Sequence, residues 1–374
     1  MPEIDPCPSH FEGKSYHCIL KKSEPMIKRT KASLPKLIIH KIGNKFNDTR
    51  NLFSEATVVF DEDSYNLLLP YLLKPFANLT ESYRFHHHAD LELNEMRSYC
   101  KAIFEDEEVF ADTSRHILTH LYEQSNSANI KTGDVLIALL EGIEFNEVST
   151  NAIGVFKIEN KTEFFQTYLE GSSLDIAVQK GISSKKIDKG CLVVNYQDDE
   201  GYVVLSVDNN NYDAQYWLRN FLHVKYADDK NFHTKAYLDL CREFSGEVLK
   251  SEYGTREQSH FLARAMDYFK ENDTLNIHDF KEEVLDMEEQ RGLFDEYKKS
   301  YETEREVLVR NQFHVSEAVV KKQKQKWRTE IRLDTNIQIR LDVDAPEASS
   351  EFLELGYDEE KKMRFYKVYF NEEA

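Results

Sequence analysis

The apolar runs in the middle of the chain predict two antiparallel β-hairpins. Asp134–Phe145 and Ala152–Glu159 are rich in β-branched and aromatic residues and are joined by a short polar segment, so we expect them to pair. Cys191–Tyr196 and Tyr202–Val207 repeat the pattern around a polar loop that ends in Gly201, which can adopt a positive φ. A four-stranded sheet of this kind can bury one face under helices. We therefore predict an α+β fold with a central antiparallel sheet built from two hairpins.

The N-terminal side of the predicted sheet supplies an edge strand and covering helices. Leu34–Lys45 predicts an edge strand that enters a turn, and Thr57–Phe60 predicts another strand. Asp61 or Asp63 then caps a helix whose apolar residues recur at helical spacing. Two further amphipathic helices are predicted at Asn94–Phe104 and Ser114–Gln124.

The second half of the chain changes to helical periodicity. Four segments carry apolar residues at spacings of three and four: Tyr212–Leu222, Asn231–Leu249, Arg256–Glu271 and His278–Met287. Glu288–Arg305 continues as a helix rich in acidic residues and lysine. The final segment combines a basic helix with alternating strands, predicted at Ser316–Gln325, Thr329–Leu333, Asn336–Val343 and Met363–Phe370.

These changes of pattern divide the chain into four predicted parts. Residues 1–33 hold four of the eight prolines and show little periodicity, so we expect a flexible N-terminal extension. Residues 34–210 form the α+β domain with the central sheet, and residues 211–305 form a helical region. Residues 306–374 form a small C-terminal segment with the basic helix and β-strands.

Six short segments carry a family resemblance. In order along the chain they are Ile39–Lys45 (IHKIGNK), Ile130–Asp134 (IKTGD), Asn151–Glu159 (NAIGVFKIE), Gly190–Asn195 (GCLVVN), Leu333–Ile339 (LDTNIQI) and Gly356–Glu359 (GYDE). They resemble the bacterial nucleoid-associated NdpA (37 kDa) family, in the form common among the Bacteroidetes, from about Leu34 to the end of the chain. These segments are scaffold-like and not catalytic signatures. The resemblance implies a cytoplasmic, nucleoid-localised homodimer that binds double-stranded DNA.

Composition independently indicates a globular protein of the cytosol. The 374 residues are 41% hydrophobic and 12% aromatic, which is enough for a packed core. No window of about 18 consecutive apolar residues occurs, and the N-terminus lacks the apolar core of a signal peptide, so we expect neither a membrane span nor export. Five widely spaced cysteines without a CxxC pair predict reduced, mostly buried thiols.

The charge balance opposes DNA binding over the whole chain but favours it locally. A net charge of −19 repels a polyanion at long range. Residues 1–45, however, hold nine Lys/Arg against four acids, and residues 310–328 hold six against one. Since salt screens charges over about 8 Å near physiological strength, basic segments gathered on one face can still bind phosphates.

The basic helix near residue 320 is the strongest candidate for DNA contact. Lysine and arginine neutralise phosphates and release counterions, which gives affinity without sequence preference. The alternative is a charged solvent face with Trp327 anchoring the core. The predicted DNA-binding residues are Lys321, Lys322, Lys324, Lys326 and Arg328, with Lys41 and Lys45 as additional contacts.

Signatures of catalysis and of metal binding are weak. The motifs GxxxxGK[ST], GxGxxG, GxSxG and HExxH are all absent, so we expect no enzyme and no cofactor. Two groups have the residue types of metal ligands. The first, which is Cys7, His10, His17 and Cys18, fits unrelated side chains of the N-terminal extension as well. The second, which is His86, His88 and Asp90, is also typical of a polar turn.

A metal-dependent nuclease is the nearest enzymatic alternative. It would place acids on one strand of a hairpin and an acid-x-Lys triplet on the next, which lets carboxylates hold Mg²⁺ while the lysine steadies a water. Asp134 and Glu141 lie on the first predicted strand, but the second offers Lys157-x-Glu159 in the reverse order. Lys157 and Glu159 share a face of the strand, and the simpler explanation is a cross-strand ion pair at a sheet surface.

Two hypotheses of different classes therefore compete ahead of the nuclease. The first is a non-enzymatic DNA-binding homodimer, which the resemblance favours. The second is an acidic scaffold that binds other proteins, including nucleoid or defence machinery, and has little direct affinity for DNA. The net charge of −19 favours this second hypothesis.

Overall fold

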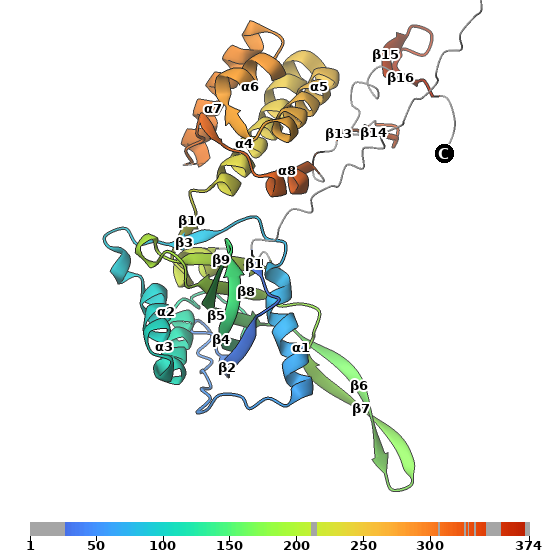
Figure 1. Cartoon of the computed structure of the whole chain (residues 1–374). Coiled ribbons are helices and arrows are strands. Elements are labelled where there is room, and N and C mark those ends of the chain that lie inside the picture. Colours follow the sequence, from blue (N-terminus) through green and yellow to red (C-terminus); the bar gives the residue numbers. More distant parts are fainter. Residues whose placement is uncertain are drawn as a thin grey trace, which may run out of the picture.

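The chain folds into two lobes joined by a short connection. The computed structural model describes residues 27–210, 215–305, 307–324, 327, 329–332, 334–341 and 353–370. Residues 27–226 form a lobe built on a β-sheet, which we call the sheet lobe, and residues 230–327 form a helical lobe (Figure 1). No helix in this described part of the chain is both long and apolar enough to cross a membrane.

The sheet lobe is built on an eight-stranded antiparallel sheet whose centre is the two predicted hairpins. The strand order is β1-β4-β5-β8-β9-β3-β10, and β2 also pairs with β4. The α+β prediction is therefore confirmed. The strands of this sheet are β1 (Ile27–Lys28), β2 (Ser33–Ile42), β3 (Tyr83–Phe85), β4 (Gly133–Phe145), β5 (Val148–Ile158), β8 (Lys189–Val194), β9 (Val203–Asp208) and β10 (Val224–Tyr226).

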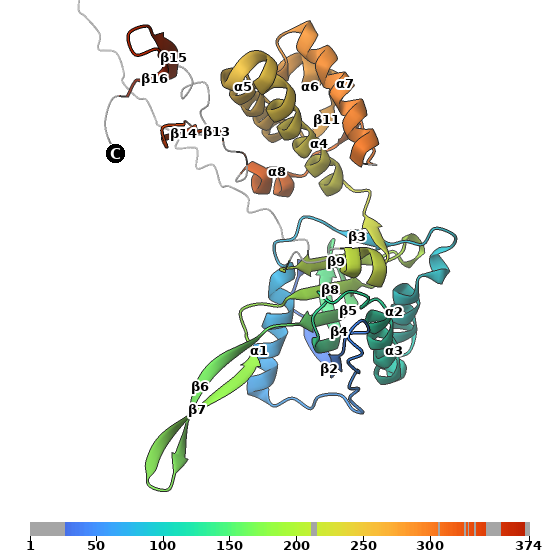
Figure 2. The same ribbon diagram turned by 180° about the vertical axis from the view of Figure 1, so that it is seen from behind.

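Both faces of this sheet are buried, which explains why its central strands are continuous apolar runs. Side chains alternate along a strand, so Ile137 of β4 enters one core while Leu136 and Ala138 enter the other. Burying each large apolar side chain contributes about 1.5–3 kcal/mol. The first core lies under α2 and α3, and the second lies under α1 (Figures 1 and 2).

The three covering helices begin at capping residues that the sequence supplies. Asp61 accepts a hydrogen bond from the Ser64 N–H, and Asn94 accepts one from the Arg97 N–H. The helices are α1 (Glu62–Leu73), α2 (Glu95–Glu105) and α3 (Phe110–Glu123), with the short 3₁₀ turns η1 (Lys74–Phe76), η2 (Leu91–Leu93), η3 (Glu107–Val109) and η4 (Asp198–Glu200).

The helical lobe has its own core, centred on aromatic rings. Tyr237 is fully buried and lies edge-on to Phe280, with a centroid distance of 5.1 Å, and Phe294 packs against both. The helices of this lobe are α4 (Lys230–Phe244), α5 (Lys250–Glu271), α6 (Ile277–Val284), α7 (Glu288–Arg305) and α8 (Glu317–Lys324), and the π-helical turn η6 (Ser245–Leu249) links α4 to α5.

Three two-stranded ribbons accompany the helical lobe and the chain beyond it. We expected the strands β13, β14 and β16, and not β11, β12 or β15. The pairs are β11 (Thr274–Asn276) with β12 (Gln312–His314), β13 (Thr329–Arg332) with β14 (Gln338–Leu341), and β15 (Leu353–Asp358) with β16 (Met363–Val368).

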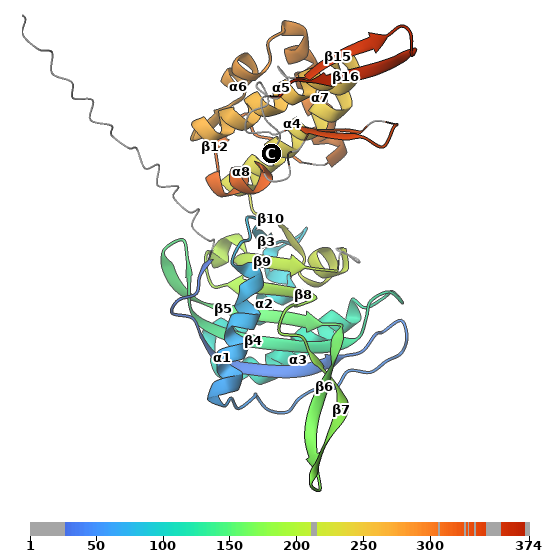
Figure 3. The ribbon, with the colours of Figure 1, turned by 90° about the vertical axis from the view of Figure 1, so that its right-hand side faces the viewer.

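A long hairpin projects from the sheet lobe between the two predicted hairpins. Its strands are β6 (Lys161–Glu170) and β7 (Ser173–Ile182), which pair along their whole length. Figures 1 and 3 show the hairpin extending away from both lobes. We predicted no helix or strand in this segment from the sequence. We call residues 161–182 the arm.

Three expectations differ from the structure. Thr57–Phe60 forms no strand, because its link to the edge of β2 is a single hydrogen bond from the Val58 N–H to the Leu37 oxygen and not a ladder. Ile27–Ser33, assigned above to the N-terminal extension, contributes β1 and the start of β2. The helix expected at Tyr212–Leu222 is a wider π-helical turn, η5 (Gln215–Phe221).

Gly142 allows β4 to bulge where β1 and β2 share it. Its φ is +66°, and an added Cβ would lie 2.3 Å from the Lys31 carbonyl oxygen. The β4–β5 register shifts at this point, between Leu140 and Ile143.

Gly142→Ala is expected to lower the free energy of unfolding by roughly 1–3 kcal/mol, because alanine disfavours this φ and would collide with backbone. Urea denaturation measures the change. Gly171→Ala is the matched control, since Gly171 at the tip of the arm has a φ of +63° and nothing within 4 Å of an added Cβ. Equal effects of the two substitutions would contradict the collision with Lys31.

Candidate functional site

Packing of one face of α8 presents its lysines to solvent. Val319, Val320 and Gln323 are buried in the helical lobe, so Lys321 and Lys322 point outward and are exposed. The residue before the helix is also held, because the Ser316 N–H donates to the Thr234 hydroxyl at 2.9 Å. The helix therefore offers fixed positive charges on an otherwise acidic chain.

Helix α8 lies on the side of the helical lobe that is nearer to the sheet lobe (Figures 1 and 3). The Lys322 ammonium donates at 3.3 Å to the hydroxyl of Thr80, which belongs to the sheet lobe. Two further contacts join the lobes nearby: Lys235 pairs with Glu81 at 2.7 Å, and the Ser82 hydroxyl donates to the Asp229 carboxylate at 2.9 Å. A ligand on α8 would thus lie at the junction of the lobes.

The other predicted contacts at this end of the chain are partly outside the described residues. Lys326 and Arg328 both fall outside them. Trp327 is 2% exposed and belongs to the core of the helical lobe. Of the two alternatives for this tryptophan, the structure shows the core anchor, so its ring does not form part of a surface that binds DNA.

Lys41 and Lys45 do not join the α8 surface. In the β2–β4 register, the backbone of Lys41 lies opposite Asp134 at the start of β4. The junction of the lobes, in contrast, adjoins Glu144 at the other end of that strand. Ten residues of extended strand separate these ends by about 33 Å. Lys45 also forms an ion pair with Glu123 of α3. The five predicted residues that the structure describes therefore fall into two distant groups.

A cleft of about 720 Å³ lies between the lobes beside α8. It is lined by carboxylates and lysines together, and the carboxylates outnumber the lysines by four to two: Glu144, Glu147, Asp273 and Glu317 against Lys28 and Lys230. Because this lining is acidic on balance, the cleft does not extend the basic surface of α8.

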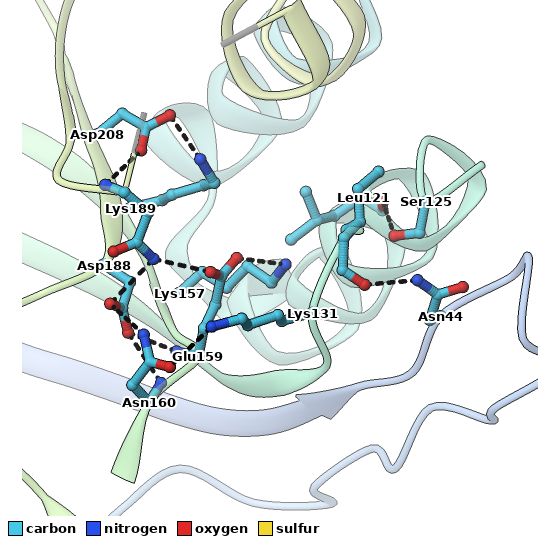
Figure 4. Close-up of polar contacts among 12 residues, drawn as sticks. Asn44, Leu121, Ser125, Lys131, Lys157, Glu159, Asn160, Asp188, Lys189 and Asp208 are labelled. Carbon is cyan, nitrogen blue, oxygen red and sulfur yellow. Dashed lines mark hydrogen bonds and ion pairs between the residues drawn. The ribbon is translucent and has the colours of Figure 1, made fainter. Parts of the chain in front are cut away.

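A second polar cluster lies buried beside the base of the arm (Figure 4). Lys157 is fully buried, and its ammonium lies 2.9 Å from the Glu159 carboxylate and 5.2 Å from the centre of the Tyr216 ring. Burial lowers the pKa of Lys157, and the facing Glu159 carboxylate opposes that shift. Nearby, the buried Lys189 pairs with Asp208.

Asp188 is the centre of this cluster. Its carboxylate accepts hydrogen bonds from the backbone N–H groups of Glu159 and Asn160, at 2.7 and 3.0 Å, and from the side-chain amides of Asn160 and Asn210. Burial works against ionisation, but these bonds together hold the pKa of Asp188 below its usual range. Asp188 thereby ties the end of β5 to the start of β8, on either side of the arm.

The arrangement expected of a nuclease is not assembled in the described residues. Asp134 pairs with Lys161 at 2.8 Å, while Glu141 lies seven residues further along β4, about 23 Å away. Lys157 and Glu159 form an ion pair with each other, but the expected cross-strand pair at a sheet surface is wrong, because the pair is buried and joins two residues of one chain segment. The described residues contain no group of three or more His, Cys, Asp or Glu side chains that could hold a metal ion.

The remaining cysteine and histidine candidates are structural where they are described. His87 accepts weak hydrogen bonds from the backbone N–H groups of Ala89 and Asp90, so the three histidines and Asp90 lie at a polar turn. Cys100, Cys191 and Cys241 are buried free thiols, and burial raises the pKa of Cys191 to about 12. Cys7, His10, His17 and Cys18 lie outside the described residues.

A comparison with protein-family models identifies the family of this sequence. The model described as nucleoid-associated protein YejK matches residues 38–364. The chain belongs to this family. The match begins inside β2 and ends inside β16, so the matched region covers most of the sheet, the arm, the helical lobe and most of the C-terminal ribbons. A comparison with curated proteins finds no match.

Membership confirms the family that the six sequence segments indicated. The assignment to a Bacteroidetes form stays a prediction. Because the match begins at Ile38, β1 and the first half of β2 lie before the part of the chain that matches the family.

Proposed function

We propose that this protein binds double-stranded DNA in the nucleoid, within the cytoplasm, as a homodimer that contacts phosphates with little sequence preference. The observation that carries the proposal is the outward face of α8, where Lys321 and Lys322 are exposed on a helix fixed by its buried side. Membership in a nucleoid-associated family supports the same conclusion. Fixed ammonium groups neutralise phosphates and release counterions whatever the base sequence.

The net charge of −19 limits the DNA-binding surface to a local one. Charges further away than about 8 Å are largely screened at physiological salt, so α8 can attract phosphates while acids elsewhere contribute little repulsion. The acidic cleft beside α8 sets a boundary to this surface. Affinity should therefore be modest and should fall steeply as salt increases.

Lys321→Ala, Lys322→Ala and Lys324→Ala combined are expected to weaken binding of a labelled duplex at least tenfold near 0.1 M salt. The slope of log K against log salt should become shallower by about 0.9 for each phosphate that the variant no longer neutralises. Fluorescence anisotropy across a salt series measures both quantities for wild type and variant.

The matched control for this experiment removes three positive charges elsewhere. Lys250, Arg256 and Lys299 are exposed on α5 and α7, and their combined replacement by alanine should leave affinity and slope close to wild type. Equal losses in both variants would mean that net charge alone controls binding. A separate variant with Lys41→Ala and Lys45→Ala tests the distant pair.

The proposal includes no catalytic activity. Lys157 is committed to Glu159, and Asp134 to Lys161, which supports a structural role for the residues that a nuclease would use. Pure protein incubated with supercoiled plasmid and Mg²⁺ should leave the plasmid intact. Mg²⁺-dependent cleavage by the pure protein would overturn this part of the proposal.

An acidic scaffold that binds other proteins is the second candidate. The apolar side chains exposed along the arm favour it, because they suit a protein surface and not a phosphate. The anisotropy series distinguishes the two functions. If wild type fails to bind duplex DNA even at low salt, the scaffold replaces DNA binding as the function.

A further inference from the structure

The arm is an amphipathic ribbon with one strongly apolar face. The register pairs Phe165 with Val178 and Leu169 with Leu174, and paired residues lie on the same face of a ribbon. Residues at the alternate positions face the other way and are mostly polar, including Gln166, Gln179, and Tyr168, whose hydroxyl donates to Asp175. The large side chains of the apolar face are Phe165, Leu169, Leu174, Ile176, Val178 and Ile182.

This apolar face is open to solvent in the single chain. Phe165 is 74% exposed and Leu174 is 76% exposed, and every residue of β6 is exposed. A two-stranded hairpin alone is marginally stable in water, and an apolar face of this kind, interrupted near its base by the Glu163–Lys180 ion pair, marks an interaction site. The arm therefore requires a partner surface.

The charges on the arm indicate that this partner is not DNA. Residues 161–182 contain two lysines against Glu163, Glu170 and Asp175. Lys161 pairs with Asp134, and Lys180 pairs with Glu163 at 3.0 Å. Phosphate binding needs lysine or arginine side chains that can replace the counterions of DNA, and this ribbon offers apolar surface in their place.

We propose that the partner is a second copy of the chain, and that the apolar faces of two arms pack on each other to form the homodimer. This inference deepens the homodimer part of the proposed function and does not depend on DNA binding. A two-fold axis brings the same patch of both copies together, so each arm covers the face that the other exposes. The packed ribbons form a two-layer sandwich with the layers about 10 Å apart.

The size of the face suits such a dimer. Six large side chains, each able to bury roughly 100–200 Å² and each still exposed by 40–76%, leave several hundred Å² of apolar surface per copy. A stable interface buries about 800 Å² per partner, so two arms that overlap along their length approach this requirement.

The charge of the chain favours contact through arms over contact through the lobes. Two copies that each carry −19 repel one another wherever their lobes approach within a screening length of about 8 Å. An arm of ten residue pairs is about 33 Å long and carries nearly balanced charge, so it joins two copies while it keeps the lobes apart.

Sedimentation velocity and light scattering across a concentration series test the proposal. Wild type is expected to be a dimer, and Phe165→Ser, Leu169→Ser and Leu174→Ser combined should raise the dimer dissociation constant at least 100-fold. The matched control is Gln166→Ser, Tyr168→Ser and Gln179→Ser on the opposite face of the same arm, which should remain dimeric. Thermal unfolding checks that the lobes stay folded, because the arm lies outside all three buried cores.

Either of two results would overturn the arm dimer: wild type that is monomeric at every concentration, or an apolar-face variant that remains as dimeric as wild type. A chain in which residues 163–180 are replaced by a short Gly/Ser turn gives the same readout if the triple variant folds poorly. Failure of DNA binding is distinguishable, since the α8 variant should still be a dimer. Near 1 M salt, where the screening length is about 3 Å, the dimer should persist while DNA is released.

Discussion

Glu159→Gln is expected to lower the free energy of unfolding by about 3–5 kcal/mol, because it leaves the Lys157 ammonium buried without its countercharge. Lys157 is fully buried and its nearest acid is Glu159, at 2.9 Å. Glutamine keeps the size of the side chain and can still accept the hydrogen bond from Asn210. The loss therefore reports the charge and not the packing. Urea denaturation near pH 7 measures it.

The double variant Lys157→Met with Glu159→Gln separates the ion pair from the rest of the cluster. Methionine retains most of the alkyl chain, and with both charges removed no ion is left uncompensated, so we expect the double variant to lose less than half of what Glu159→Gln alone loses. A double variant as unstable as the single one would contradict this account. That result would mean that packing or hydrogen bonds, and not the charge of the ion pair, stabilise the cluster.

The pH dependence of Glu159→Gln gives an independent check. Burial lowers the pKa of Lys157 in the folded protein, while an unfolded lysine has a pKa of about 10.4. As pH rises toward the unfolded value, the folded state releases this proton before the unfolded state does, so stability rises with pH. In wild type, Glu159 opposes the lowering of this pKa, and the variant lacks that opposing charge. The difference in stability between wild type and variant should therefore become smaller at alkaline pH.

The central sheet could be predicted from the sequence because its strands are buried on both faces. Runs such as Leu136 to Leu140 are apolar at every position, and the polar loops between them locate the turns. The arm carries a different signal, in which apolar residues alternate at Leu174, Ile176 and Val178 after a turn at Gly171. That alternation predicts a half-buried strand, but only the three-dimensional arrangement shows that the apolar face lies against nothing in the described part of its own chain.

The candidate DNA-binding site could be predicted only in part. The lysines of α8 cluster because a short helix keeps neighbours together, so Lys321 and Lys322 are exposed side by side as expected. Lys41 carries the same charge, yet the antiparallel pairing of β2 with β4 places it at the end of the sheet away from α8. The sequence shows how charges cluster along the chain, whereas the direction of each strand decides which charges lie close together in space.

His40 is expected to make the stability of the sheet lobe depend on pH between about 6.5 and 4. The ring is fully buried in β2, where Nδ1 accepts the Ser54 N–H at 3.0 Å and Nε2 lies 3.0 Å from the Ser114 hydroxyl. Since Nδ1 must accept, the neutral ring with its proton on Nε2 fits the folded state. Burial, with a further contribution from Arg115, lowers the pKa of His40 to about 4.

The sign of the His40 effect follows from the two pKa values. Above pH 6.5 the ring is neutral in both states, and its contribution to stability is fully present. Between 6.5 and 4 the unfolded state binds a proton that the folded state does not, so stability falls by about 3 kcal/mol over this window, at about 1.36 kcal/mol for each pH unit. Protonation of Nδ1 also breaks the bond to Ser54, which releases the segment that covers the edge of β2.

Urea denaturation of wild type and His40→Gln at about pH 7.5 and about pH 4.5 tests this effect. Glutamine does not titrate, so the variant should lose about 2.5 kcal/mol less than wild type between these two pH values, even if it is less stable at neutral pH. Ser114→Ala is the control, because it removes a partner of the ring and keeps the titrating group, and it should retain most of the wild-type pH dependence. If His40→Gln keeps the full acid sensitivity of wild type, the sensitivity belongs to other groups and the buried neutral ring is not its cause.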